Sequence, residues 1–257
     1  MRTVRIRKVE IGTGQPKIAV SIMGETLEAV CTQAQAARLS GADVAEWRID
    51  SFRHGNSPEA VADCLPALRA ALCEMPLLAT FRTQREGGCL SCSTAAYRAV
   101  NEAVIASGCA DLLDLELFTE PQTLSALLTA ARHSALPVVL SNHDFEKTPP
   151  QEELVQRFRR MRALGGDLLK LAVMPHNRGD VLALLGAAAK IHEETDRPLI
   201  AISMGPLGAI TRICVGYFGS AMTFAAAAQS SAPGQIPVQQ LSMLLKLLES
   251  SAPQQSC

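Results

Sequence analysis

Aromatic residues are scarce in this chain, and neither sign of charge is in clear excess. Phe, Trp and Tyr together make up 4% of the 257 residues, and 24 Lys and Arg nearly balance 25 Asp and Glu. Nucleic-acid-binding proteins usually carry a basic patch, and those that bind single strands stack bases on aromatic side chains. The composition therefore argues against a nucleic-acid partner. A hydrophobic content of 48% is instead typical of a globular enzyme.

Long apolar runs are missing as well. No uninterrupted apolar segment reaches the roughly 20 residues that a membrane-spanning helix requires. Residues 1–8 are basic, but the apolar stretch of a secretory signal does not follow them. We therefore expect no membrane partner and a cytoplasmic location.

Eight cysteines are scattered through the sequence, mostly in apolar contexts that are typical of reduced core residues. Cys89 and Cys92 form one Cys-x-x-Cys pair, which is compatible with a redox role or with half of a zinc site. No second pair or nearby histidine has the spacing of a zinc ligand set, so coincidence is the preferred interpretation. We expect no metal site.

Strand-like apolar runs alternate with longer helical patterns along almost the whole chain. The expected strands are 18–22, 43–49, 77–81, 111–117, 137–141, 168–173, 199–203 and 221–225, and the expected helices are 26–39, 58–72, 94–107, 121–133, 151–164, 178–194 and 237–249. Such a repeat without a linker predicts an α/β protein with one domain over residues 1–257, a single (β/α)8 TIM barrel. A short N-terminal β-hairpin is expected at 3–7, with a turn near 12–14. The competing open sheet is disfavoured because no Gly-x-Gly-x-x-Gly turn follows the first strand.

Lys170 interrupts an apolar run, 168–173, that has the pattern of a strand buried on both faces. A buried ammonium is costly, so this lysine must be paired, lie at a wet strand end or be neutral. A neutral amine in a dry pocket is a nucleophile toward carbonyls. The pattern leaves open the alternative of a lysine that only extends along a strand edge to solvent.

Polar side chains gather at the ends of the other expected strands, where residues two apart share a face. The sets that share such a face are Ser21 and Met23; Glu46, Arg48 and Asp50; Thr80 and Arg82; and Asp114 and Glu116. His143 follows the fifth strand and lies about one repeat unit before Lys170, so the two are expected to be lateral neighbours. Each residue alone is compatible with a structural role, such as a solvated ion pair. A barrel brings them together at the carboxyl ends of its strands, where active sites lie.

The residue types at this mouth indicate a particular chemistry. A lysine that forms an imine with a ketone creates an electron sink, so a proton can leave the adjacent carbon near neutral pH. His143 is suited to take that proton and deliver it to a leaving hydroxyl, and Glu86 is expected to hold one tautomer of His143. Arg82 and Arg212 favour a neutral Lys170 by like-charge repulsion, and a guanidinium matches a carboxylate. The expected substrate is therefore a small, hydroxylated, anionic ketone.

At this level of detail the chain resembles a known family over nearly its whole length. The motifs that carry the resemblance are Glu46-Trp-Arg48-Ile-Asp50, Thr80-Phe-Arg82 with Glu86-Gly-Gly88, Asp114-Leu-Glu116, Ser141-Asn-His143-Asp-Phe145 with Thr148-Pro149, Lys170-Leu-Ala-Val-Met-Pro175, Met204-Gly205, Phe218-Gly-Ser220 with Thr223-Phe224, and Ser231-Ala-Pro-Gly-Gln235. Together and in this order they resemble the type I 3-dehydroquinate dehydratases, the Schiff-base dehydratases of the shikimate pathway, which leads to chorismate and the aromatic amino acids.

The resemblance implies a role for each matching residue. Lys170 would form the imine with the C3 ketone of 3-dehydroquinate, His143 would remove the C2 proton and assist loss of the C1 hydroxyl, and Glu86 would support His143. The substrate-binding residues implied in the same way are Ser21, Glu46, Arg48, Arg82, Arg212, Ser231 and Gln235. Arg212 is expected to hold the substrate carboxylate, with Ser231 and Gln235 on a loop that closes over the site. The family implies no cofactor, no metal and a homodimer.

Two other interpretations are weighed against this one. A class I aldolase acting on sugar phosphates needs a backbone-rich phosphate site after the seventh and eighth strands, but Gly205, Gly208 and Gly219 are dispersed here. A non-catalytic sensor of a shikimate-pathway metabolite should have lost the amine or the imidazole, and this chain keeps both. The one departure near the expected carboxylate site is Thr211, where the family usually has serine, and threonine retains the hydroxyl.

Overall fold

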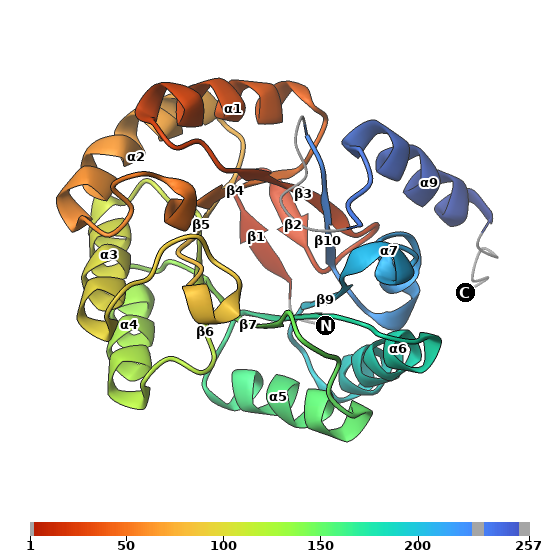
Figure 1. Cartoon of the computed structure of the whole chain (residues 1–257). Helices are drawn as coiled ribbons and strands as arrows, with labels where there is room; N and C mark the ends of the chain where they lie inside the picture. Colours follow the sequence, from red (N-terminus) through yellow and green to blue (C-terminus); the bar gives the residue numbers. More distant parts are fainter. Residues whose placement is uncertain (1–2, 228–233, 252–257) are drawn as a thin grey trace.

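The computed structural model describes residues 3–227 and 234–251, and it shows eight parallel strands surrounded by helices (Figure 1). The strands of the barrel are β3 (Lys17–Ile22), β4 (Val44–Arg48), β5 (Leu77–Thr80), β6 (Leu112–Glu116), β7 (Val138–Asp144), β8 (Leu168–Val173), β9 (Leu199–Ser203) and β10 (Met222–Ala225). They pair in the order β10-β3-β4-β5-β6-β7-β8-β9, and a bridge between Leu199 and Ser220 brings the two ends of the sheet together. The predicted TIM barrel is confirmed.

The helices follow the strands as the repeat predicts, with one exception. The long helices are α1 (Leu27–Leu39), α2 (Pro58–Leu72), α3 (Thr94–Ser107), α4 (Pro121–His133), α5 (Gln151–Ala163), α6 (Arg178–Glu194) and α9 (Val238–Ser251), and the short ones are η1 (Ile49–Ser51), η2 (Gln84–Glu86), α7 (Gly205–Gly208), α8 (Thr211–Cys214) and η3 (Val215–Phe218). After β9 the chain forms only short helical turns, because Gly205, Pro206 and Gly208 oppose a long helix. This interruption places Arg212 on a single turn beside the barrel mouth.

Local sequence signals explain where the helices begin and end. Ser57 caps α2 by accepting a hydrogen bond from the backbone of Ala60, and Pro58 occupies the first turn. Asn177 and Asp180 form a reciprocal capping box at the start of α6. Gly108 ends α3 with φ of 62°, a left-handed conformation that glycine adopts without strain. These signals fix where each of the three helices begins or ends.

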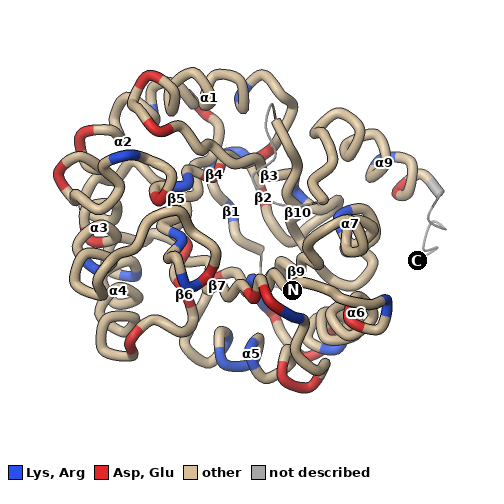
Figure 2. The backbone as a smooth tube through the Cα atoms, in the orientation of Figure 1, with Lys and Arg blue, Asp and Glu red and all other residues tan. Residues whose placement is uncertain are grey.

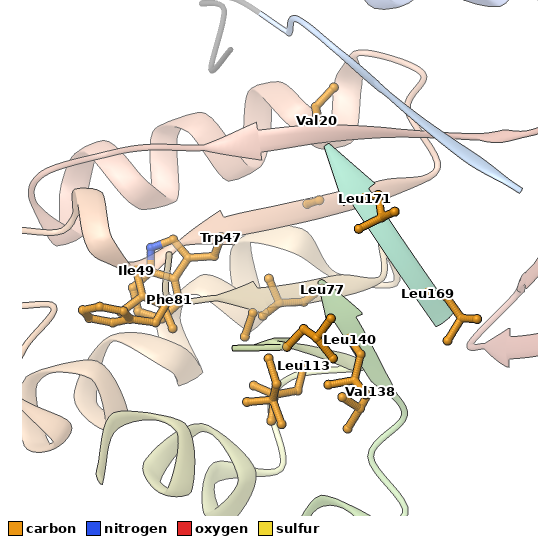
Figure 3. Packing of buried hydrophobic residues seen from close by; sticks show 14 of the residues in the cluster. Val20, Trp47, Ile49, Leu77, Phe81, Leu113, Val138, Leu140, Leu169 and Leu171 are labelled. Carbon is orange, nitrogen blue, oxygen red and sulfur yellow. The ribbon is translucent and has the colours of Figure 1, made fainter. Parts of the chain in front are cut away.

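Two hydrophobic layers hold the barrel together. The outer layer lies between the sheet and the helices and includes Trp47, Leu113 and Leu140 (Figure 3). The inner layer lies inside the strands and includes Val44 and Leu168, which belong to the first residues of their strands. Ala172, Ile202 and Phe224 of the same layer lie nearer the carboxyl ends of their strands, beside the polar residues described below.

The predicted N-terminal hairpin is present, but its turn differs from the predicted one. Strands β1 (Val4–Ile6) and β2 (Val9–Ile11) pair antiparallel, so the chain turns at residues 7–8 rather than near 12–14. The hairpin covers the amino end of the barrel, where Val4, Ile6 and Ile11 join the inner hydrophobic layer.

Arg7 attaches the hairpin to the barrel, and Arg69 of α2 binds the same carboxylate. Arg7 Nε and Arg69 Nη1 donate to the two oxygens of Asp111 at 2.7 and 2.8 Å, and Asp111 immediately precedes β6. The amino end is therefore closed, and the carboxyl end is left to form the site.

Candidate active site

Lys170 lies in the middle of β8 and is only 3% exposed. Its Nζ is 3.4 Å from Glu46 Oε1 and 3.3 Å from Asp114 Oδ2, and it lies 4.6 Å from the centre of the Phe224 ring. Both oxygen distances are long for a hydrogen bond, so the amine is enclosed by three groups without being tightly bound to one. Arg82 and Arg212 were expected to favour a neutral Lys170 by like-charge repulsion, but the charged groups in contact with the amine are the two carboxylates.

His143 and Glu86 form a closely coupled pair. Glu86 Oε2 accepts from the backbone N–H of His143 at 2.9 Å and lies 3.1 Å from the ring nitrogen Nδ1. Burial and the positive charges of Arg82, Lys170 and Arg48 hold the pKa of His143 well below its usual value. The imidazole is therefore neutral at pH 7. Because Nδ1 faces the Glu86 carboxylate, we assign the ring proton to Nδ1, and Nε2 then keeps a lone pair that can accept a proton.

The pairing of β7 with β8 sets the positions of the lysine and the histidine. Lys170 is opposite Ser141, and His143 is opposite Ala172. Residues two apart on a strand share a face, so His143 lies on the same side as Lys170 and one pleat nearer the mouth. The predicted lateral relation between the two is confirmed, with this offset.

Arg82 is the centre of a buried ionic network between β5, β6 and β7. Its guanidinium donates to Asp114 Oδ1 at 2.8 Å and to Glu116 Oε1 at 3.1 Å, and it lies 3.5 Å from Glu86 Oε2. Burial alone would lower the pKa of Arg82, but Asp114, Glu116 and Glu86 outweigh it and raise the pKa above its usual value. Acidic and basic residues accordingly lie close together around β5 and β6 in Figure 2. Arg82 is thus a fixed cation that orders the surrounding carboxylates.

The pKa of Glu86 is raised, whereas the pKa of an acid in an ordinary ion pair is lowered. Burial and the nearby charge of Glu116 raise the pKa of Glu86 to about 7, although Arg82 and two donors oppose the shift. Its two donors besides the ring are the backbone of His143 and the side chain of Asn142. Glu86 is therefore close to half ionised at neutral pH, so the loss of one hydrogen-bond donor would change its ionised fraction.

Two further arginines lie at the mouth, and they bind different partners. Arg48 donates through Nε and Nη2 to both oxygens of Asp50 at 2.8 Å each. Arg212 is buried on α8 and donates from Nη1 to the backbone carbonyl of Phe224 at 3.0 Å. Burial lowers the pKa of Arg212 to about 10, so it is still a cation at pH 7. A buried guanidinium is well suited to pair with a carboxylate.

One pocket at the carboxyl ends of the strands collects the predicted site residues. Those that line it are Ser21, Glu46, Arg48, Arg82, Glu86, His143, Lys170, Arg212 and Gln235. Ser231 lies outside the described residues. Ser21 Oγ donates to Glu46 Oε2 at 2.7 Å, which orients that carboxylate within the pocket.

The pocket also contains residues that were not predicted as part of the site. They are Gly87, Phe145, Ala172, Ile202, Met204 and Phe224. The strand period offered a signal for Ala172, which is two residues after Lys170. Asp114 was placed at the correct strand end but was not assigned to the site, and it contacts the amine directly. The apolar members form the dry walls of the pocket.

The described part of the chain offers neither a metal site nor a membrane span. Within residues 3–227 and 234–251, no cluster of three or more His, Cys, Asp or Glu side chains has a geometry that could hold a metal ion. Over the same residues, none of the helices has the length and apolar character needed to cross a membrane.

Comparison with known proteins gives consistent matches over almost the whole chain. The family model described as Type I 3-dehydroquinase matches residues 18–252. The 3-dehydroquinate dehydratases of Salmonella paratyphi B and Salmonella heidelberg are each 44% identical over 249 residues, which cover 96% of this chain and 99% of the relative.

Solved structures with similar folds lead to the same family. A type I 3-dehydroquinate dehydratase from Clostridium difficile, with covalently modified comenic acid, has a TM-score of 0.94 at 40% identity and covers 98% of this chain and 99% of its own. The 3-dehydroquinate dehydratase from Geobacillus kaustophilus has a TM-score of 0.95 at 36% identity, with 98% of each chain covered.

Proposed function

The chain belongs to the type I 3-dehydroquinase family and is a hydro-lyase acting on 3-dehydroquinate, and we propose that it works through an imine between Lys170 and the substrate ketone. The observation that carries this mechanism is the position of Lys170, buried on β8 on the same side of the sheet as a neutral imidazole. A buried amine and an adjacent base are the two groups that dehydration through an imine requires.

The reaction divides into four balanced steps. The amine of Lys170 adds to the C3 carbonyl carbon, and water leaves to form a protonated imine. His143 then takes the C2 proton through Nε2, and the C2–H electron pair flows into the imine to form an enamine. The enamine expels the C1 hydroxyl, which receives the proton from the imidazolium and leaves as water. Hydrolysis of the remaining imine releases 3-dehydroshikimate and regenerates Lys170.

The charged residues around Lys170 and His143 act in different steps of the reaction. The carboxylates of Glu46 and Asp114 are the nearest acceptors for the proton that the lysine ammonium must lose before attack. Glu86 keeps His143 in the tautomer that leaves Nε2 available. Arg82 balances the charge of the acidic groups, so the site can hold several carboxylates without protonating all of them.

Substrate recognition is assigned to the rim of the pocket. Arg212 pairs with the substrate carboxylate, and Glu46 and Arg48 bind ring hydroxyls. Arg82, Ser21 and Gln235 complete the polar lining. We assign Ser231 to the same role from the family resemblance.

Borohydride trapping tests this mechanism directly. The protein is mixed with 3-dehydroquinate and reduced, and its peptides are analysed by mass spectrometry for added mass on the one that contains Lys170. An adduct at Lys170 supports the imine mechanism. Adduct formation with a sugar phosphate instead would favour an aldolase, and failure to trap any ketone would favour a sensor.

The biological setting is proposed from the family resemblance. We assign the enzyme to the shikimate pathway, in the cytoplasm, as a homodimer. Rescue of growth without aromatic amino acids in a strain that lacks this dehydratase tests the pathway, and light scattering of the purified protein tests the dimer.

A further inference from the structure

A line of polar contacts joins the Glu86–His143 pair to the outer helix α5. Asn142 is only 4% exposed and donates from Nδ2 to Glu86 Oε1 at 3.0 Å. Its Oδ1 accepts from Arg157 Nη1 at 2.6 Å, and Arg157 lies on α5 outside the sheet. Neither Asn142 nor Arg157 lines the substrate pocket. These two residues therefore contact the pair from behind, without access to the substrate.

Glu86 is held from both faces of β7. Side chains alternate along a strand, so Asn142 points to the opposite face from His143. The carboxylate lies across the end of the strand, with Oε2 toward His143 and Oε1 toward Asn142. Fixing one oxygen therefore fixes the other, because the carboxylate is planar. The contact with Asn142 sets the angle at which Glu86 meets the imidazole.

Arg157 determines which end of the Asn142 amide faces Glu86. A guanidinium has only donors, so the amide oxygen must face Arg157 and the amide N–H must face the carboxylate. The reversed amide would place an N–H against a guanidinium and an oxygen against a carboxylate, and both contacts would be repulsive. The network itself thus assigns the orientation of the amide.

Arg157 is held in place by contacts on the outside of the barrel. Its guanidinium lies 5.5 Å from the centre of the Phe118 ring and donates to Glu153 one turn earlier on α5. It also lies 4.0 Å from Asp144, the residue that follows His143. The side chain is 15% exposed, so it has little freedom to leave the amide. The donor to Asn142 is preorganised before any substrate arrives.

We propose that Asn142 and Arg157 are positioning residues that hold the Glu86 carboxylate in its ionised, imidazole-orienting state. The inference rests on the proposed role of His143 as the acid and base of the reaction. The charged groups that face Glu86 are Arg82 and Glu116, together with His143 itself. Arg82 and Asn142 are side chains that favour the ionised form of Glu86. Of these two, Asn142 does not line the pocket, so its donor can be removed without changing the pocket lining.

The test is the pH dependence of kcat and KM in matched variants. Arg157→Met removes the donor to Asn142, and Asn142→Leu removes the donor to Glu86. Asn142→Leu raises the pKa of Glu86 because the ionised form loses a hydrogen bond. Arg157→Met raises it because the amide is no longer held with its N–H toward the carboxylate. In both variants the acid limb of the kcat profile moves to higher pH. We expect kcat at neutral pH to fall by about 10-fold or more, since hydrogen bonds to charged groups are the stronger ones. KM should change by less than about twofold, because neither residue lines the pocket.

Arg160→Met is the matched control. Arg160 lies on the same helix with its guanidinium 5.3 Å from the same Phe118 ring, and it is not part of the contact line to Glu86. This variant should keep the wild-type pH profile, whereas Arg157→Lys should restore much of the activity because it keeps a donor. Trapping at Lys170 should persist in each variant and verifies that the barrel is folded.

The outcomes separate this inference from the proposed mechanism. An unshifted acid limb in both Arg157→Met and Asn142→Leu would overturn the inference, as would an equal shift in Arg160→Met. His143→Ala is measured in the same series. If His143→Ala retains turnover, the role of His143 itself fails. If His143→Ala is inactive while the other profiles are unshifted, only the positioning inference fails.

Discussion

Replacing Asp114 by Asn tests how strongly the buried charges of the site stabilise the fold. Asp114 is fully buried, lies 2.8 Å from Arg82 and 3.3 Å from Lys170, and accepts from Ser141 at 2.6 Å. Asn keeps the size and one acceptor but removes the charge between two cations. We expect the free energy of unfolding to fall, because the two cations stay buried with less compensation.

The magnitude follows from the distances and the burial. At an effective dielectric constant of about 20, one pair of unit charges 3.3 Å apart is worth roughly 5 kcal/mol before desolvation is considered. Removing one partner of a buried ion pair typically costs about 3–5 kcal/mol. For a protein of this size each kcal/mol corresponds to about 2–4 °C in melting temperature, so Asp114→Asn should melt at least about 6 °C lower.

A surface pair provides the control for this estimate. Arg98 Nε and Glu102 Oε1 are 2.7 Å apart on α3, but Glu102 is 44% exposed. Glu102→Gln should change the free energy of unfolding by only about 0.3–0.5 kcal/mol, because water screens an exposed pair. The assay is urea or thermal unfolding of both variants against wild type. Equal, small effects for the two substitutions would refute the argument that burial decides the value of these contacts.

The difference in the free energy of unfolding between wild type and Asp114→Asn should also depend on pH. Burial alone would raise the pKa of Asp114, but Arg82 and Lys170 outweigh it and hold the pKa below its usual value. A lowered pKa means that the stabilisation is fully present above the unfolded pKa of about 3.9 and is lost as pH falls through the folded pKa. Wild type and Asp114→Asn should therefore differ at pH 7 and converge only in strong acid.

Three substitutions in the pocket test the assigned roles by kinetics. Lys170→Ala should abolish trapping by borohydride and nearly all turnover, and full trapping on another residue would exclude Lys170 as the imine former. His143→Ala should still be trapped on Lys170 while kcat falls by roughly 10²–10⁴-fold, and undiminished kcat would remove this histidine from the mechanism. Arg212→Ala should mainly raise KM in steady-state assays, because a carboxylate clamp contributes to binding. An unchanged KM would mean that another group binds the carboxylate.

The barrel could be predicted because its signal repeats. Most units carry an apolar strand and a long helix, often with a capping residue such as Ser57 or Asn177. An error in predicting one unit therefore does not change the predicted architecture. The site could be predicted for a related reason, since parallel strands bring their carboxyl ends to one place. Lys170 and His143 were therefore located together from their strand positions alone.

The parts that sequence reasoning missed depend on contacts between distant side chains. The carboxylates beside Lys170 come from β4 and β6, and the closed barrel brings them within 3.4 Å of the amine. The link from Arg157 through Asn142 to Glu86 joins three elements by the direction of one amide, which no periodicity encodes. The hairpin turn was misplaced because Gly12 and Gly14 are strong turn formers, whereas the observed turn uses Arg7 with φ of 50°.

The closed amino end of the barrel determines how small molecules enter and leave the site. Among the residues that the structure describes, Val4, Ile6 and Ile11 fill the end opposite the pocket and block the axis for a ligand held against Lys170. Reactant and product must diffuse through the same opening. Each molecule formed has to depart before the next can arrive, and accumulated product competes with fresh reactant for the vacant enzyme.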